Sequence, residues 1–181
     1  MKIRLMQSLA LASLLLIAPL ALAADRATES FREEHAEVKV HLQHLHDMSG
    51  SMAGSDSDAQ RKTAKFVAKF LTEHILTHAT WEEQHLYPAV DKRTHTGEYA
   101  FTTSMRYEHR IVGREIAELN ELAAGDALDA VAFARKTDRL LGLISAHFEE
   151  EEEVLLPILD KATTREALEK ELEMGGHAKH H

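Results

Sequence analysis

The amino-acid sequence predicts an all-α fold: an up-down-up-down four-helix bundle with an internal twofold repeat and a short fifth helix near the C-terminus. Apolar residues recur at helical spacing, and strand signals are nearly absent. Two segments 69 positions apart, beginning at His78 and His147, share the pattern H-x-x-x-E-E-x-x-L-x-P-x-[VL]-D-K. Beyond residue 23, proline occurs once in each repeat, at Pro88 and Pro157. Four helices with short connections favour this bundle topology.

The first hairpin is expected to contain helices at about 28–48 and 58–87. In the first helix, one stripe carries Phe31, His35, Val38, Leu42 and Leu45. The intervening segment 49–57 is rich in glycine and serine, which predicts a loop. The second helix is expected to end near Tyr87, because a proline disfavours helical geometry in the residue before it.

The second hairpin is expected to contain helices at about 98–123 and 127–156. The stripe of its first helix consists of Met105, His109, Val112, Ile116 and Leu119. Gly125 and Asp126 have the pattern of a helix end followed by a new helix start. A fifth helix is expected at 164–174, because Thr163 and Glu166 have the spacing of a capping box.

The first helices of the hairpins also match each other. Segment 32–38 aligns with segment 106–112 at an offset of 74, which pairs His35 with His109. This second repeat predicts a pseudo-twofold axis that relates the halves and passes through a shared polar site.

The N-terminus has the features of a secretory signal peptide at residues 1–23. Lys2 and Arg4 precede an apolar run, and Ala21-Leu22-Ala23 supplies a small-x-small cleavage pattern. Cleavage after Ala23 would leave a domain at 24–174 and a histidine-containing tail at 175–181. The sequence thus predicts a periplasmic or secreted protein that is not inserted in the membrane after cleavage.

Composition excludes several function classes. Removing Lys2 and Arg4 takes the formal net charge from −9 to −11, which argues against nucleic acid and anionic membranes as partners. The chain has no cysteine, so disulfides, iron–sulfur clusters, thiolate zinc sites and thiol catalysis are all excluded. Any metal must therefore be held by nitrogen and oxygen. No protein partner is indicated.

Six repeated polar residues form the predicted metal site. A histidine and a glutamate four positions apart lie on one helical face with Cβ atoms roughly 5–6 Å apart, close enough to share a metal. His35 and His109 lie on otherwise apolar stripes, where a lone histidine is more often a satisfied core residue than a ligand. The repetition of the set favours ligation. The predicted ligands are His35, His78, Glu82, His109, His147 and Glu151.

The order H…H-x-x-x-E…H…H-x-x-x-E, with E-E-x-x-L-x-P after each pair, resembles the hemerythrin-like family, also called the HHE cation-binding domain. The resemblance covers about residues 31–161. It implies a four-helix bundle that holds two iron ions bridged by two carboxylates, Glu82 and Glu151. His35 and His78 would then serve one iron, and His109 and His147 the other.

The sequence departs from the oxygen-carrying members of that family at one position. Those proteins have a further histidine four residues after the first on the third helix, where this chain has Gly113. One iron would lack a protein ligand unless a neighbouring carboxylate or a water takes its place. An iron with more exchangeable positions is better suited to reacting with small molecules than to simple reversible oxygen carriage.

The remaining polar residues receive weaker assignments. Glu83 and Glu152 repeat but point about 100° away from the ligand glutamates, which favours a solvated or supporting role. His74 and His85 have no repeat partner and are expected at the surface or beside the ligands. Tyr87 shows no alignment with the ligand face.

Two functions are predicted from these observations. The first is a non-haem di-iron protein of the cell envelope that binds or reacts with dioxygen, nitric oxide or peroxide. The alternative is a metal-binding or buffering protein without small-molecule chemistry, motivated by the 13 histidines and the histidine-bearing tail. A binding protein is favoured over a dedicated enzyme, because the sequence indicates no proton donor and no electron-transfer partner.

Overall fold

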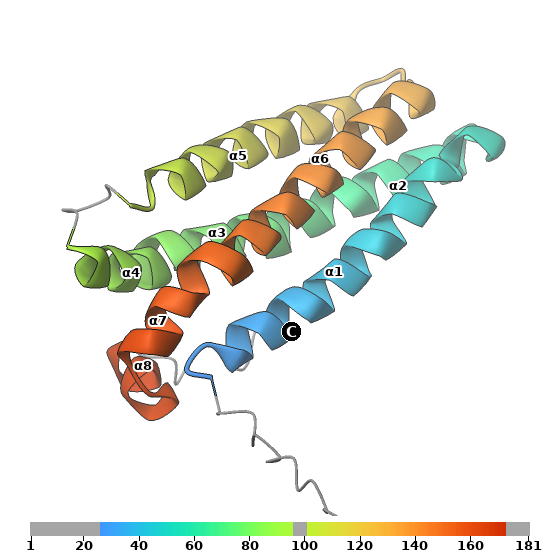
Figure 1. Ribbon diagram of the computed structural model, residues 1–181. Coiled ribbons are helices and arrows are strands. Elements are labelled where there is room, and N and C mark those ends of the chain that lie inside the picture. Colours follow the sequence, from blue (N-terminus) through green and yellow to red (C-terminus); the bar gives the residue numbers. More distant parts are fainter. Residues whose placement is uncertain (1–25, 96–100, 173–181) are drawn as a thin grey trace, which may run out of the picture.

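Four helical rods lie side by side in a computed structural model that describes residues 26–95 and 101–172 (Figure 1). The first rod is α1 (Glu29–Gly50), and the third is α5 (Thr103–Ala124). The predicted all-α class is confirmed, because the described residues contain no strand. The predicted signal peptide at 1–23 and tail at 175–181 lie outside the described residues. No described helix is both long enough and apolar enough to cross a bilayer.

The second and fourth rods change helical type along their length. The second rod consists of α2 (Ser57–Phe70), the π-helical turn η2 (Leu71–Ile75), α3 (Leu76–Trp81), the π-helical turn η3 (Glu82–Leu86) and α4 (Tyr87–Thr94). The fourth consists of α6 (Ala130–Glu150), the π-helical turn η4 (Glu151–Leu155) and α7 (Leu156–Ala162). π-Helical turns are rare and often occur at functional sites. Here η3 and η4 begin at the two repeated glutamates, Glu82 and Glu151.

The expected ends of these rods near Tyr87 and Leu156 were wrong, because both continue past their prolines. The N–H of Tyr87 donates to the carbonyl of Glu82, five residues back. This register leaves the carbonyl of Glu83 without a backbone donor, and Arg106 Nη1 donates to it at 3.2 Å. Pro88 follows at the start of α4, where the missing proline N–H costs little. In η4 the same role falls to Arg32, whose Nη1 donates to the Glu152 carbonyl at 2.9 Å.

Helix starts are set by side-chain caps. Asp56 accepts hydrogen bonds from the backbone N–H groups at the start of α2. Asp129 caps α6 in the same way, so the predicted helix start at about residue 127 is three residues too early. The segment expected to be only a loop contains the 3₁₀ turn η1 (Met52–Gly54), where Met52 is buried.

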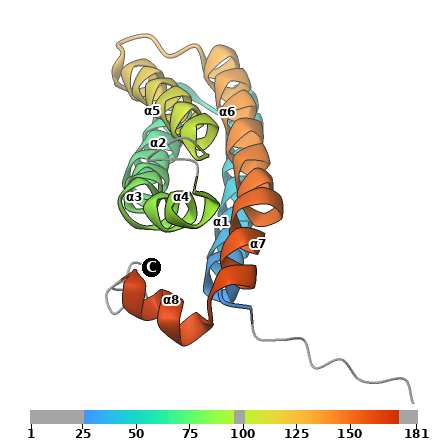
Figure 2. The same cartoon turned by 60° about the vertical axis from the view of Figure 1, so that its left-hand side comes forward.

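The predicted fifth helix is present as α8 (Arg165–Glu171), capped by Thr164 rather than by Thr163. It packs at the end of the bundle near α4 and α7, where Leu168 is fully buried (Figure 2). Arg93 on α4 pairs with Glu171 on α8 at 2.6 Å. The described part ends at residue 172, so the predicted extension to 174 is not covered.

The apolar core is divided into two clusters by one polar layer. One cluster includes Leu42, Ile75, Val112 and Phe148, and the other includes Phe31, Leu86, Met105 and Leu155. On every rod, a buried histidine or glutamate lies between the residues that contribute to the two clusters. The fold therefore places one polar layer across the interior of the bundle.

Candidate metal centre

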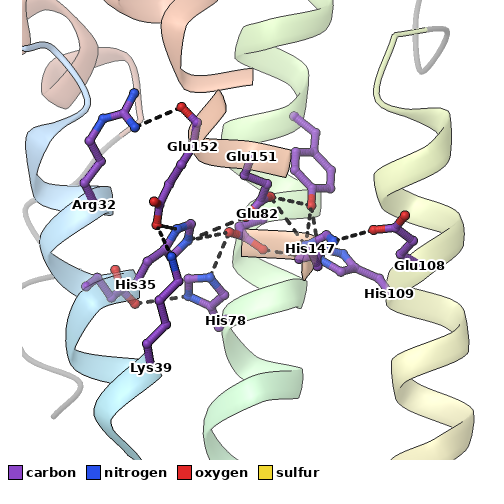
Figure 3. A network of polar contacts seen from close by, with 12 residues as sticks. Arg32, His35, Lys39, His78, Glu82, Glu108, His109, His147, Glu151 and Glu152 are labelled. Atoms are coloured by element: carbon purple, nitrogen blue, oxygen red, sulfur yellow. Dashed lines mark hydrogen bonds and ion pairs between the residues drawn. The ribbon is translucent and has the colours of Figure 1, made fainter. Parts of the chain in front are cut away.

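The six predicted ligands meet in the polar layer, and all of them are buried (Figure 3). Their donor atoms form two groups of four, and within each group all atoms lie within 4.8 Å of one another. The first group contains His35 and His78, and the second contains His109 and His147. Glu82 and Glu151 belong to both groups. The sequence therefore identified a set of residues that the fold brings together.

Each shared carboxylate turns one oxygen toward each histidine pair. Glu82 Oε1 lies 2.8 Å from His78 Nε2, and Glu82 Oε2 lies 3.3 Å from His109 Nε2. Glu151 Oε2 lies 3.5 Å from His35 Nε2, and Glu151 Oε1 lies 3.6 Å from His147 Nε2. This arrangement is what a carboxylate needs to bridge two cations.

Each histidine is oriented by a further carboxylate at its other ring nitrogen. The Nδ1 atoms of His35 and His109 contact Glu152 and Glu83 at 3.2 and 3.1 Å, and those of His78 and His147 contact Glu34 and Glu108 at 3.1 and 2.8 Å. Ionised carboxylates only accept hydrogen bonds, so in each pair Nδ1 is the donor. A neutral imidazole held this way presents the lone pair of Nε2 to the centre.

These carboxylates settle the roles of several repeated residues. Glu83 and Glu152 support the histidines rather than joining the ligand groups, in agreement with the weaker assignment made from helical geometry. Glu34 and Glu108 were not predicted. They directly precede His35 and His109 in the matching segments, so their repetition was the signal that could have identified them.

The residues present fit a bound metal. Five buried donor atoms of the centre have no hydrogen-bond partner within the described part of the chain: His35 Nε2, His78 Nε2, both oxygens of Glu82 and Oε2 of Glu151. Leaving such atoms unsatisfied costs about 1–3 kcal/mol each. Nitrogen and oxygen donors aimed at one point suit a transition-metal ion, which would satisfy them together.

The electrostatics of the buried side chains also favour a bound cation. Burial and the neighbouring charge of Glu82 raise the pKa of Glu151 well above its usual value. Burial lowers the pKa of His78, but the charges of Glu82 and Glu34 outweigh it and hold that pKa well above its usual value. The centre thus favours positive charge beside its carboxylates, which cations would supply.

A pair of crossed clamps holds the halves together around the centre. Arg32 on α1 donates to the Glu152 carbonyl and pairs with Asp160 at 3.2 Å, and both of these residues belong to the second half. In return, Arg106 on α5 contacts the Glu83 carbonyl and lies 3.8 Å from Asp91 of the first half. The repeated Asp-Lys at the end of each motif thus supplies an anchor for the opposite half.

A groove of about 1030 Å³ runs along the outside of α1, α2 and α3 and reaches His78. Its lining combines the apolar side chains of Phe70 and Trp81 with acidic residues and further histidines. His41 and His74 both pack against the Phe70 ring, with centroids 5.5 and 4.4 Å away. His74 is exposed, as expected, and the ring of His85 packs at a tilt against that of Trp81, with centroids 5.2 Å apart. Neither belongs to a ligand group.

Tyr87 reaches the ligand face, contrary to the expectation from the sequence that it would not align with that face. Its side chain is fully buried, and its hydroxyl donates to Glu151 Oε1 at 2.7 Å. The hydroxyl oxygen of Tyr87 also lies 3.1 Å from His109 Nε2 and 3.4 Å from His147 Nε2. The π-helical turn η3 ends at Leu86, so the change of register that brings Tyr87 inward is not visible in a regular helical projection. Burial and the charges of Glu82 and Glu151 raise the pKa of Tyr87 far above its usual value, so without a metal it is a neutral donor.

Comparison with known proteins gives one family. The family model of the hemerythrin HHE cation-binding domain matches residues 26–159, which is most of the chain. No curated protein and no solved structure matched.

Proposed function

Because this chain belongs to the hemerythrin HHE cation-binding family, we propose that it is a non-haem di-iron protein that binds or reacts with dioxygen, nitric oxide or peroxide. The observation that carries the proposal is the pair of four-residue groups sharing Glu82 and Glu151. Two iron ions held there would supply exchangeable coordination positions for such a small molecule.

The donor set favours iron or a related transition metal over calcium and magnesium. Each group offers two imidazole nitrogens and two carboxylate oxygens, a mixture that suits iron and related transition metals. An all-oxygen set would favour calcium or magnesium, and thiolates are absent from the chain. The crossed clamps and the four supporting glutamates fix the donors before a metal arrives, which favours binding.

The groove beside α1 gives a route by which a small molecule reaches the centre. Its lining includes His78, one of the predicted ligands of the first group, whereas His35 is fully buried. The stacked ring of Phe148, with its centroid 4.3 Å from that of His35, closes this part of the centre. Water is therefore excluded from most of the site.

The proposal also includes the finer arrangement and the location of the protein. Equivalent contacts at Arg32 and Arg106, and at the four Nδ1 atoms, support an up-down-up-down bundle whose halves are related by a twofold axis. The Lys2-to-Ala23 segment supports export to the cell envelope. A binding function remains favoured over dedicated catalysis.

Metal analysis tests the proposal. Protein produced with ample iron is expected to carry about two irons per chain, with the visible bands of a bridged diferric pair that change on adding azide, nitric oxide or peroxide. Glu151→Ala should lose most of the iron, because that residue belongs to both groups. Glu153→Ala is the matched control, since it lies on the same turn but is exposed.

The result that contradicts the proposal is zinc alone, or one metal or fewer per chain after iron-replete expression. Truncation after Met174 tests the buffering alternative, under which the tail histidines carry much of the binding. Unchanged stoichiometry and affinity in the truncated protein would count against buffering and in favour of the buried centre.

A further inference from the structure

We propose that Tyr87 is a ligand, through its phenolate oxygen, of the metal ion held by His109 and His147. This inference rests on the proposed function, because it assigns one more donor to the same centre. The Tyr87 oxygen lies 2.7, 3.1 and 3.4 Å from donor atoms of Glu151, His109 and His147. Adjacent donors on an octahedral ion with bonds near 2.1 Å are about 3 Å apart. The hydroxyl thus occupies the distance range of a neighbouring ligand.

The ring of Tyr87 is held in this position by two packing contacts, with His109 and with Arg106. It stacks on the His109 ring with centroids 5.3 Å apart and an interplanar angle of 21°. The guanidinium carbon of Arg106 lies 5.1 Å from the Tyr87 centroid. Arg106 is the same residue that binds the carbonyl released by η3, so one side chain stabilises the turn and the ring that follows it.

The ligand pattern leaves the pair of His109 and His147 one donor short, and Tyr87 presents an oxygen to that pair. Gly113 stands one helical turn after His109, on the side of the centre that would lack a ligand. A Cβ atom built at Gly113 would meet only Leu76 Cδ2, at 3.8 Å, so no other side chain fills the space immediately there. Tyr87 approaches the same histidine pair from the opposite half of the chain.

The assignment makes the two metal positions chemically different. The repeat partner of Tyr87 is Leu156, which is fully buried and has no donor atom. The group with His35 and His78 therefore has no equivalent oxygen from that position, whereas the group with His109 and His147 does. An anionic oxygen donor favours the ferric state of the ion it binds. On coordination the hydroxyl proton is released to solvent.

Spectroscopy of the iron-loaded full-length protein tests this ligand directly. A phenolate bound to ferric iron gives a charge-transfer band in the visible range, and excitation in that band enhances tyrosine ring vibrations in the Raman spectrum. We expect both in the wild-type protein and expect them to be lost in Tyr87→Phe. Tyr107→Phe is the control, because Tyr107 is 55% exposed and should leave the spectrum unchanged.

The variant should also bind one of its two irons at least about 10-fold more weakly in competition with a chelator, because loss of a supporting partner alone lowers metal affinity about 10- to 100-fold. Ring-deuterated tyrosine in the wild-type protein provides a second test that does not depend on folding of the variant. Its Raman bands should shift if a tyrosine is bound. Iron-loaded protein without these bands, or bands that persist in Tyr87→Phe, would overturn the proposal and leave the di-iron function standing. Failure to bind iron at all would instead refute the proposed function.

Discussion

Replacing Glu108 by alanine should weaken metal binding at one position of the centre while sparing the other. The Glu108 carboxylate accepts the hydrogen bond from His147 Nδ1 at 2.8 Å, the shortest of the four such contacts. Without it the buried imidazole is free to rotate or to change tautomer, so Nε2 is no longer directed at the metal. Loss of a supporting partner of this kind lowers metal affinity about 10- to 100-fold, or about 1.4–2.7 kcal/mol.

The solvent exposure of the two side chains indicates which end of this range of affinity loss applies. The side chain of His147 is 3% exposed and that of Glu108 is 25% exposed, so water can reach the vacated position and accept part of the hydrogen bonding. We therefore expect a loss of affinity near the tenfold end. Glu34→Ala should act in the same way on the position served by His78.

Chelator competition, followed through iron content and the visible spectrum, measures the effect. The Glu108→Ala protein should show one weakened iron and one with nearly normal affinity. Glu121→Ala is the control, because Glu121 lies on the same helix, is exposed and is far from the centre along α5. Equal affinities in the Glu108 and Glu121 variants, or equal weakening of both irons, would refute the reasoning.

Three further predictions concern stability. Arg32→Met should lower the free energy of unfolding of the protein without iron by about 2–3 kcal/mol, because the Glu152 carbonyl and Asp160 lose a charged donor. Arg114→Met, at an exposed position, should change it by less than about 0.5 kcal/mol. Urea titrations measure both. Hydrogen bonds from Arg93 lower the pKa of Glu171, so its stabilisation is present above the unfolded-state pKa and is lost as the pH falls through the lowered value. Glu171→Gln should therefore be less stable than wild type by up to about 1 kcal/mol at pH 7, and equal unfolding curves at neutral pH would contradict this. Iron removal should lower the melting temperature, with a loss of about 2.7 kcal/mol for each iron site when free metal stands 100-fold above its dissociation constant. Equal melting curves would exclude this linkage.

The residues of the centre could be predicted because the sequence motif that contains them occurs twice in the chain. A single His-x-x-x-Glu pair on an apolar helix is weak evidence, but the pairs at His78 and His147 recur with the same flanking residues. The matching segments around His35 and His109 supplied the other two imidazoles. The fold class followed from helical periodicity, which is strong in long amphipathic segments.

The helix ends and Tyr87 could not be predicted because both depend on π-helical turns. Such a turn adds a residue to one helical cycle, so a regular projection assigns the wrong faces to the residues after it. The carbonyl freed at Glu83 is satisfied by Arg106, 23 residues later in the chain. The rule that proline disfavours helical geometry in the preceding residue considers only local sequence and does not include this tertiary contact. It therefore predicted a helix end that is too early.

The crossed arginines make the two hairpins depend on each other. Arg32 binds η4 and Asp160, and Arg106 binds η3 and contacts Asp91, so neither hairpin contains the donor that its own π-helical turn requires. A hairpin produced alone would have to obtain this donor from a second copy of itself. The domain is therefore expected to unfold as one cooperative unit, with neither half persisting after the other has melted.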